Sequence, residues 1–301
     1  MYDYIIIGAG PAGLTAGIYA SMANKKALII EKMYAGGQLN IINNIKNYPG
    51  FEGINGFDLS LNMKSQAEKL GAKIVTEEVV SVELLNDVKK VKTHNNTYEA
   101  NAVIIATGAY ARQLDVNNEK EFLGKGVSYC ATCDGNFFKD KTVAVVGGGD
   151  TSLEDCLYLS NIAKKIYLIH RREVFRGKEG TLNKVKALAS AEQGKVEILT
   201  NYVVTNLHGN DKLEKITIQN KISGEEKDLN VDGIFVAIGR KPDTAIFADQ
   251  VKLTDGGFIE TDDLMRTNIK NVLAVGDVRN TNLRQIVTAC ADGAIAVMKN
   301  C

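Results

Sequence analysis

Two stretches of this sequence repeat one pattern of an apolar strand, a glycine-rich turn, a helix and a second strand. They read YIIIGAGPAGLTAGIYASMANKKALIIEK and TVAVVGGGDTSLEDCLYLSNIAKKIYLIHRR, and they align without a gap so that Gly8 and Gly10 match Gly147 and Gly149. At such positions glycines let the pyrophosphate of a dinucleotide approach the backbone at a helix N-terminus. The repeat therefore predicts two dinucleotide-binding folds in one chain.

The residues that end the second strand of each copy distinguish the two predicted sites. The first copy has Glu31 there, and a carboxylate at this point can accept hydrogen bonds from ribose hydroxyls. The second copy has His170, Arg171 and Arg172, with Arg176 shortly after them. A cationic cluster suits the 2′-phosphate of NADPH. The second site is therefore predicted to prefer NADPH over NADH.

In the stretch YCATCDG, two residues separate Cys130 from Cys133. A CxxC pair in a reducing compartment is either half of a metal site or a redox pair. A structural zinc site needs further ligands. The remaining cysteines, Cys156, Cys290 and Cys301, are solitary, and the three histidines are scattered. The residues therefore favour a redox pair, and we expect no metal.

Composition describes an ordinary globular protein without a dominant charge. Lys and Arg number 36, Asp and Glu also number 36, and the formal net charge is zero. Such a balance gives no electrostatic reason to expect nucleic acid or an anionic membrane as a partner. Neither a signal peptide nor an apolar run long enough for a transmembrane helix is recognisable. We expect a cytoplasmic protein.

Each copy of the repeat is followed by alternating segments and then by a strand that runs into a glycine. These strands are AVIIATGAY and GIFVAIGRKPDT. A third such strand leads into Gly276 and Asp277, before a helix that begins near Arg284. An aspartate in this place can hold the ribityl or pyrophosphate part of a cofactor at a helix N-terminus, or it can simply cap the turn.

The chain resembles the bacterial low-molecular-weight thioredoxin reductases over nearly its whole length. The motifs that carry the resemblance are, in order, GAGPAGLTAGIYA, GGQL, NYPGF, ATGA, YCATCDG, GGGDTSLE, HRREVFR and GDVRNTNLRQIVTA. The resemblance implies an α/β fold with two Rossmann-like dinucleotide-binding domains of the three-layer ββα type. A discontinuous FAD domain, residues 1–112 and 243–301, would contain an inserted NADPH domain, residues 113–242, that carries the CxxC. The resemblance also implies a homodimer whose partner is thioredoxin or a thioredoxin-like disulfide protein.

The same resemblance assigns site residues. Non-covalently bound FAD would be held by Gly8, Gly10, Pro11, Ala12, Gly13, Glu31, Gly36, Gly37, Gln38, Leu39, Asn47, Thr107, Gly108, Gly276, Asp277, Arg284, Gln285 and Ile286. NADPH would be held by Gly147, Gly149, Asp150, Thr151, Ser152, His170, Arg171, Arg172 and Arg176. Ser152 departs from the usual Gly or Ala at its position.

The resemblance implies that Cys130 attacks the partner and that Cys133 faces the flavin. Asp134 is expected to be the acid and base for the thiols, although a helix cap or turn carboxylate is the plain alternative. Because the CxxC and the nicotinamide must both reach the flavin, we expect the inserted domain to rotate about hinges near residues 112–116 and 240–244.

Three alternative functions remain at this point. A ferredoxin-dependent flavin thioredoxin reductase would have the same fold but would not use NADPH, and HRREVFR disfavours it. The flavoprotein of a peroxide-reducing system would carry an N-terminal thioredoxin-like extension. A non-catalytic flavin redox sensor would turn over negligible NADPH.

Overall fold

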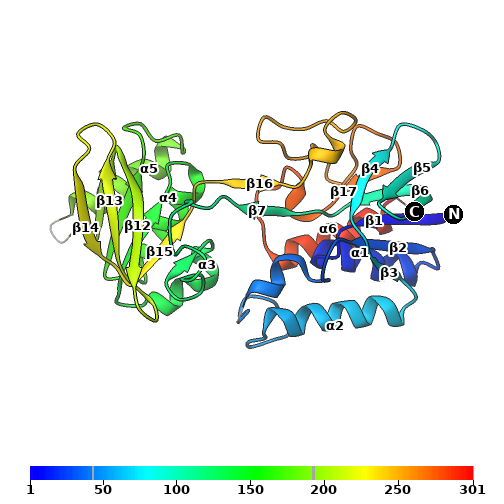
Figure 1. Ribbon diagram of the computed structural model, residues 1–301, viewed down its shortest axis with the longest axis horizontal. Coiled ribbons are helices and arrows are strands. Elements are labelled where there is room, and N and C mark those ends of the chain that lie inside the picture. The colour runs from blue at the N-terminus through cyan, green and yellow to red at the C-terminus, as the bar shows by residue number, and fades with distance from the viewer. Residues whose placement is uncertain (43, 192–193, 301) are drawn as a thin grey trace. The chain divides into compact units, whose positions relative to one another are not determined.

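The computed structural model describes residues 1–42, 44–191 and 194–300. Its chain forms two compact units (Figure 1). One consists of Met1–Tyr110 with Lys241–Cys301, and the other consists of Ala111–Arg240. The second unit is thus an insertion in the first, and the chain crosses between them twice.

The sheet of the discontinuous unit is mixed. Its strand order is β3-β2-β1-β6-β5-β4, and the C-terminal half of β6 also pairs with β17. The ladders from β3 to β6 and the β6–β17 ladder are parallel, whereas β4, β5 and β6 pair antiparallel. The strands are β1 (Tyr2–Ile7), β2 (Ala27–Glu31), β3 (Lys73–Thr76), β4 (Val79–Glu83), β5 (Lys89–Thr93), β6 (Thr97–Ile105) and β17 (Val272–Ala274).

Apolar side chains fill both faces of this sheet, as expected for parallel strands that are covered on both sides. On β1, Ile6 packs into the core that contains the helices, while Ile5 and Ile7 pack into a second core with Phe247 and Ile259. The helices are α1 (Pro11–Met22), α2 (Gly56–Lys69) and α6 (Ile286–Met298), with short 3₁₀ turns η1 (Gly37–Ile41), η3 (Ala245–Phe247) and η4 (Gly276–Val278).

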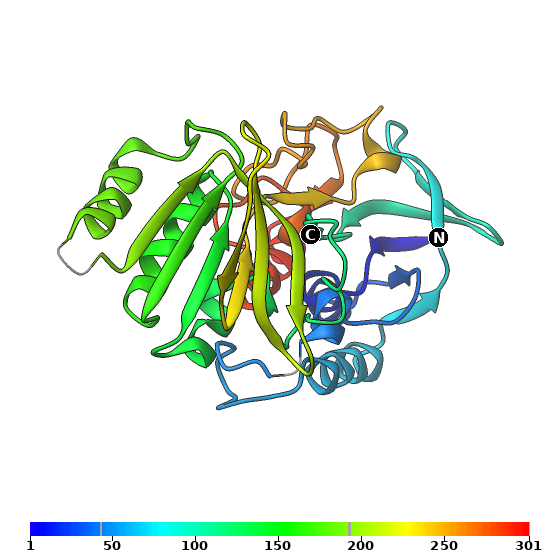
Figure 2. The ribbon, with the colours of Figure 1, turned by 60° about the vertical axis from the view of Figure 1, so that its left-hand side comes forward.

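The inserted unit has three layers (Figure 2). Its central sheet is parallel, in the order β11-β10-β9-β15-β8. The strands are β8 (Val127–Ser128), β9 (Thr142–Val146), β10 (Lys165–His170), β11 (Val196–Thr200) and β15 (Gly233–Val236). The other elements are α3 (Ala131–Asp134), η2 (Gly135–Phe138), α4 (Asp150–Ser160), α5 (Glu179–Ser190) and the antiparallel strands β12 (Tyr202–Gly209), β13 (Leu213–Asn220) and β14 (Glu226–Asn230).

Alternate residues of β9 separate two apolar cores in this unit. Val143 and Val145 pack with the helices, whereas Ala144 and Val146 pack with the three-stranded sheet. The unit therefore has three layers: the parallel sheet lies in the middle, with the three-stranded antiparallel sheet on one face and the helices on the other. This confirms the predicted α/β fold of the three-layer ββα type.

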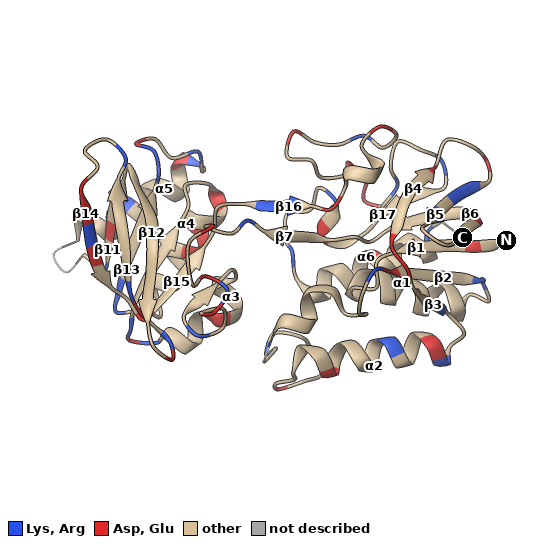
Figure 3. Ribbon diagram, in the orientation of Figure 1, with Lys and Arg blue, Asp and Glu red and all other residues tan. Residues whose placement is uncertain are grey.

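The two crossings pair with each other as a two-stranded ribbon of β7 (Ala109–Ala111) and β16 (Arg240–Pro242). The Arg112 amide donates to the Gly239 carbonyl at 3.0 Å, and the Asp243 amide donates to the Gly108 carbonyl at 3.1 Å. Lys and Arg, as well as Asp and Glu, are scattered over both units (Figure 3). In the described ranges no helix is both long and apolar enough to cross a membrane.

A buried ion pair connects η4 with α6 in the discontinuous unit. Asp292, 6 % exposed, accepts from Arg279 Nε at 2.7 Å and from Arg279 Nη2 at 3.0 Å. Its Oδ2 also accepts from the Gly276 amide at 2.9 Å. The carboxylate therefore holds the backbone of η4 against α6.

Asp292→Asn should strongly destabilise the discontinuous unit, because it leaves the Arg279 charge buried without a counter-ion. Removing one partner of such a pair costs about 3–5 kcal/mol, to be measured as the free energy of unfolding in urea. Glu68→Gln is the control, since Glu68 forms an exposed pair with Lys64 and its loss should cost less than about 1 kcal/mol. Equal losses in the two variants would contradict this assignment.

Candidate functional site

The first glycine-rich turn connects β1 to α1 and leaves no room for side chains at two of its glycines. A Cβ on Gly8 would lie 2.4 Å from the Ala106 carbonyl oxygen, and one on Gly13 would lie 1.9 Å from the Gly8 carbonyl oxygen. In contrast, Gly10 caps α1, has open space around its missing Cβ, and is followed by Pro11 as the first helical residue. The turn is therefore closed on the protein side and open at the helix N-terminus, as a pyrophosphate cradle requires.

Glu31 lies at the end of β2, beside this turn. Its Oε2 accepts from the Ala9 amide at 2.8 Å, and its Oε1 accepts from the Met33 amide at 3.2 Å. Two amides thus fix the carboxylate next to the cradle. Since each oxygen has a second lone pair, Glu31 can still accept hydrogen bonds from ribose hydroxyls.

The GGQL segment folds back onto the same turn. The Gly36 amide donates to the Ala9 carbonyl at 2.7 Å, and a Cβ on Gly37 would lie 3.4 Å from the Gly10 Cα. Both glycines have positive φ, +116° and +55°, which other residues rarely adopt. Leu39 then anchors the segment in the core. The structure therefore brings this predicted segment to the open side of the cradle.

Three further predicted residues lie near the point where β6 runs into β7. Gln38 donates through Nε2 to the Ala109 carbonyl. The Thr107 hydroxyl donates to the Asp243 carbonyl at 2.6 Å, so it connects the two crossings. Gly108 has φ +73° and open space around its missing Cβ. A ligand can therefore approach the backbone at Gly108.

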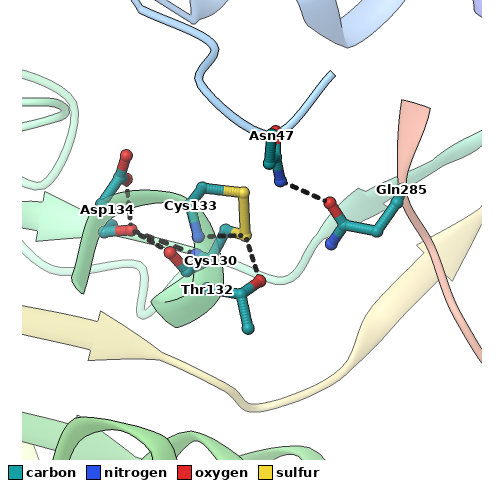
Figure 4. The surroundings of a disulfide bond; sticks show 7 residues. Asn47, Cys130, Thr132, Cys133, Asp134 and Gln285 are labelled. Carbon is teal, nitrogen blue, oxygen red and sulfur yellow. Dashed lines mark hydrogen bonds between the residues drawn. A yellow bond between two sulfur atoms is a disulfide. The ribbon is translucent and has the colours of Figure 1, made fainter. Parts of the chain in front are cut away.

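Residues far apart in the sequence meet at the start of α6. Asn47 donates through Nδ2 to Gln285 Oε1 at 2.9 Å (Figure 4). Gln285 is the N-cap of α6, forms a capping box with Thr288, and precedes Ile286, the first residue of the helix. The NYPGF and RQI motifs are thereby joined at a helix N-terminus.

The Gly-Asp motif lies in η4 against the first turn of α1. A Cβ on Gly276 would lie 3.0 Å from the Ala12 Cβ, which places Asp277 at the same helix end. Arg284 stacks on the Phe258 ring, with its guanidinium carbon 4.3 Å from the ring centroid. The first glycine-rich turn, Glu31, the GGQL segment and the Gly-Asp motif therefore lie around the N-terminal end of α1, and these residues fit a dinucleotide.

The second glycine-rich turn connects β9 to α4 in the same manner. A Cβ on Gly147 would lie 2.4 Å from the Ala237 carbonyl oxygen, whereas Gly149 caps α4 and has open space around its missing Cβ. Ser152 is fully buried, and its hydroxyl donates to the Gly149 carbonyl at 2.8 Å. The unusual serine is thus accommodated by a hydrogen bond inside the turn.

Asp150 and Thr151 form the first turn of α4 with that serine. Asp150 Oδ1 accepts from the Lys178 amide at 2.7 Å, and Thr151 is exposed. Asp150 therefore joins α4 to the segment that follows the arginine cluster.

The three predicted arginines, Arg171, Arg172 and Arg176, are exposed. The Arg176 amide donates to the Gly148 carbonyl at 2.7 Å. This bond holds the arginine-bearing loop beside the glycine turn. Exposed guanidinium groups in that place can reach a phosphate near the helix N-terminus.

His170 has a different environment from these arginines. It is 5 % exposed, its Nε2 donates to the Val174 carbonyl at 3.1 Å, and its ring lies 4.8 Å from that of Phe175. A Cβ on Gly148 would lie 2.1 Å from the His170 ring. Burial, with a smaller effect of the arginines, lowers the pKa of His170. The His170 ring therefore packs against the glycine turn at Gly148. A contact between His170 and a cofactor stays a prediction.

The CxxC pair forms a disulfide at the start of α3, with the two Cα atoms 5.3 Å apart (Figure 4). Cys130 is the N-cap of this short helix. Both cysteines are partly exposed. Reagents from solution can therefore reach the disulfide, as a redox pair requires.

Asp134, at the end of α3, has a raised pKa, chiefly because it is buried. The Ser128 hydroxyl donates to Asp134 Oδ2 at 2.6 Å and accepts from the Cys130 amide at 3.1 Å. The serine therefore holds the acid and the cysteine backbone together. The sequence analysis did not identify Ser128, whose only signal was its place two residues before the CxxC.

A buried carboxylate holds the segment that precedes the CxxC. Glu119, 3 % exposed, accepts from the amides of Leu114 and Asp115 at 2.9 and 3.0 Å. It also accepts from the Tyr129 hydroxyl at 2.7 Å. Burial and this carboxylate raise the pKa of Tyr129. Glu119 thus fixes the residue next to Cys130, and the sequence analysis did not identify it.

Among the described residues, the two free cysteines, Cys156 and Cys290, lie apart from the disulfide. Cys156 is buried on α4, and burial raises the pKa of its thiol to about 12. Cys290, on α6, lies 3.8 Å from the Tyr48 hydroxyl, and Cys301 lies outside the described residues. Among those residues, no group of three or more His, Cys, Asp or Glu side chains could hold a metal ion.

Comparison with known proteins agrees with this geometry. A family model described as pyridine nucleotide-disulphide oxidoreductase matches residues 2–293. A thioredoxin reductase of Bacillus subtilis (strain 168) is 42% identical over 98% of this chain and 92% of its own length. One of Treponema pallidum (strain Nichols) is 40% identical over 98% and 94%.

A crystal structure of thioredoxin reductase from Streptococcus pyogenes MGAS5005 has a TM-score of 0.91 at 41% identity, and the match covers 99% of this chain and 96% of that one. The chain therefore belongs to the pyridine nucleotide-disulphide oxidoreductases, which act on a sulfur group, and within them to the thioredoxin reductases.

Proposed function

We propose that the protein is an NADPH-dependent thioredoxin-disulfide reductase that contains FAD and works as a cytoplasmic homodimer. The observation that carries the proposal is the Cys130–Cys133 disulfide in a chain with two dinucleotide cradles, with the protonatable Asp134 next to Cys133 in the sequence. Membership of the family implies a flavin and a nicotinamide cofactor. The names of the relatives support thioredoxin as the substrate.

FAD is assigned to the discontinuous domain, residues 1–112 and 243–301, and NADPH to residues 113–242. Glu31 supports the first assignment, because its fixed carboxylate suits a ribose with free hydroxyls. Arg171, Arg172 and Arg176 support the second, because they suit a 2′-phosphate. When bound, the two cofactors supply the hydride transfer that delivers two electrons to the disulfide.

Three residues of the chain carry out the disulfide exchange and the proton transfer: Cys130, Cys133 and Asp134. Two electrons and one proton convert the disulfide to one thiol and one thiolate. Cys130 then attacks the disulfide of the partner as a thiolate, and Cys133 resolves the mixed disulfide. Asp134 donates a proton to the leaving thiolate and takes one back, since burial keeps its carboxyl protonated to a higher pH than an exposed aspartate.

The inserted domain is proposed to rotate so that the disulfide and the nicotinamide reach the flavin in turn. Residues 112–116 and 240–244 flank the β7–β16 ribbon and would form the hinges. A ferredoxin-dependent enzyme would not use NADPH and so would not need the arginine cluster. A non-catalytic sensor would oxidise negligible NADPH. NADPH-dependent turnover therefore separates the proposal from both alternatives.

Asp134→Asn should slow NADPH-dependent reduction of thioredoxin by about a hundredfold or more, because general acid–base catalysis by one group contributes about that much. The Kd for NADPH should not change. Both quantities can be measured by stopped-flow and by equilibrium titration. Asp211→Asn, which changes an exposed carboxylate between β12 and β13, is the control. Unchanged turnover in Asp134→Asn would remove this residue from the mechanism.

Replacing Arg171 and Arg172 together by Gln should raise the KM for NADPH by about a hundredfold or more, because each hydrogen bond to a charged group is worth about 1.5–3 kcal/mol and the variant removes both arginines. The KM for NADH, which has no 2′-phosphate, should stay the same. Steady-state kinetics with each nucleotide measures both. Lys184→Gln on α5 is the control. An equal effect on both nucleotides, or on neither, would refute the assignment of this site.

A further inference from the structure

Two hydrogen-bond donors converge on one sulfur of the disulfide. The Cys133 amide donates to Cys130 Sγ at 3.2 Å, and the Thr132 hydroxyl lies 3.4 Å from the same atom (Figure 4). Because a sulfur in a disulfide carries no hydrogen, the hydroxyl must be the donor. The part of the chain that the structure describes places no such donor on the Cys133 sulfur. The two sulfurs are therefore electrostatically different before any reaction begins.

This difference determines how the bond opens. When an S–S bond is cleaved by a pair of electrons, one sulfur leaves as a thiolate, and the sulfur with the lower thiol pKa leaves faster. Hydrogen bonds to a charged form stabilise that form and shift the pKa in its favour. Cys130, with two donors, is accordingly the better leaving group and the more abundant thiolate.

We propose that the Thr132 hydroxyl, together with the Cys133 amide, selects Cys130 as the sulfur that leaves as a thiolate and then attacks the partner. The inference rests on the proposed function and adds a catalytic residue to it, since Thr132 touches a reacting atom. Thr132 is exposed, and the Cys130 sulfur is the side-chain contact of its hydroxyl that the structure gives.

The electrons and protons balance in each step. Two electrons enter the disulfide, the Cys130–Cys133 bond breaks, and Cys133 takes up a proton while Cys130 stays a thiolate. Cys130 then bonds to one sulfur of the partner disulfide, and the other partner sulfur leaves and takes a proton. Finally Cys133 loses its proton and attacks Cys130, which restores the internal disulfide and releases the second partner sulfur. The enzyme dithiol is oxidised and the partner disulfide is reduced.

The test measures the pKa and the reaction rate of the Cys130 thiol in Cys133→Ser protein, without NADPH or thioredoxin. Its reaction with a small aromatic disulfide, dithiobis(nitrobenzoate), is followed against pH with Thr132 and with Thr132→Val. Loss of one hydrogen bond to a thiolate should raise the pKa of Cys130 by about one unit. Thr132→Ser, which keeps the hydroxyl, should restore the original pKa.

The Thr132→Val protein should react more slowly than the protein with Thr132 near neutral pH and faster at high pH. At neutral pH a one-unit rise leaves about tenfold less thiolate, but that thiolate is about threefold more nucleophilic, because exchange rates rise with thiol pKa with a coefficient of about 0.4–0.5. Thr132→Val should therefore react about threefold more slowly near pH 7 and about threefold faster above both pKa values. A residue with only a structural role would not produce this crossing.

The reciprocal variant provides the internal control. In Cys130→Ser protein the pKa of Cys133 should not respond to Thr132→Val, and Thr181→Val on α5 should not affect Cys130. The titratable groups around the motif, Asp134, Tyr129 with Glu119, and Tyr158, are retained throughout and cancel in each comparison.

No shift of the Cys130 pKa, or equal shifts of both cysteines, would overturn the inference. Neither result would touch the proposed function, because the assay involves neither nucleotide nor thioredoxin. Conversely, a selective Cys130 shift in a protein that fails to reduce thioredoxin would support the inference while refuting the proposed function.

Discussion

The architecture depends on two backbone contacts that exclude a Cβ, one in each glycine-rich turn. In the first turn Gly13 lies against the Gly8 carbonyl, and in the second Gly147 lies against the Ala237 carbonyl. The Gly13 contact brings α1 close to the end of β1, and the Gly147 contact brings the turn after β9 close to the end of β15. The helix N-termini face open space at Gly10 and at Gly149. A chain that buries both contacts obtains two places where an anionic cofactor can approach backbone amides.

The redox motif is built differently, from short polar contacts rather than from a tight turn. Ser128 connects the Asp134 carboxyl to the Cys130 amide, and Glu119 fixes Tyr129 from the other side. The position of the CxxC is thus set by hydrogen bonds between buried groups. A buried donor or acceptor that loses its partner costs more free energy than the hydrogen bond contributes when it is made. The same network holds the protonatable Asp134 carboxyl on Ser128 and keeps it partly shielded from water.

Much of the fold could be predicted from the sequence because its strongest signals are local. The spacing of Gly8, Gly10 and Gly13, and its repetition at Gly147 and Gly149, predicts a strand, a turn and a helix in order. The supporting residues could not be predicted in this way. Glu119 and Ser128 act through partners that only the folded chain brings near them, and the one sequence signal for either is the place of Ser128 two residues before the CxxC. The burial of the His170 ring against Gly148 could not be predicted either, because successive side chains of a strand point to opposite faces of the sheet and the sequence does not show which face the last residue of β10 takes.

Anaerobic titration of the purified protein tests the central claim most directly. The account predicts a yellow protein whose flavin absorbance is bleached by stoichiometric NADPH and recovers when oxidised thioredoxin is added. A colourless protein, a flavin that NADPH does not bleach, or a reduced flavin that thioredoxin does not reoxidise would contradict it.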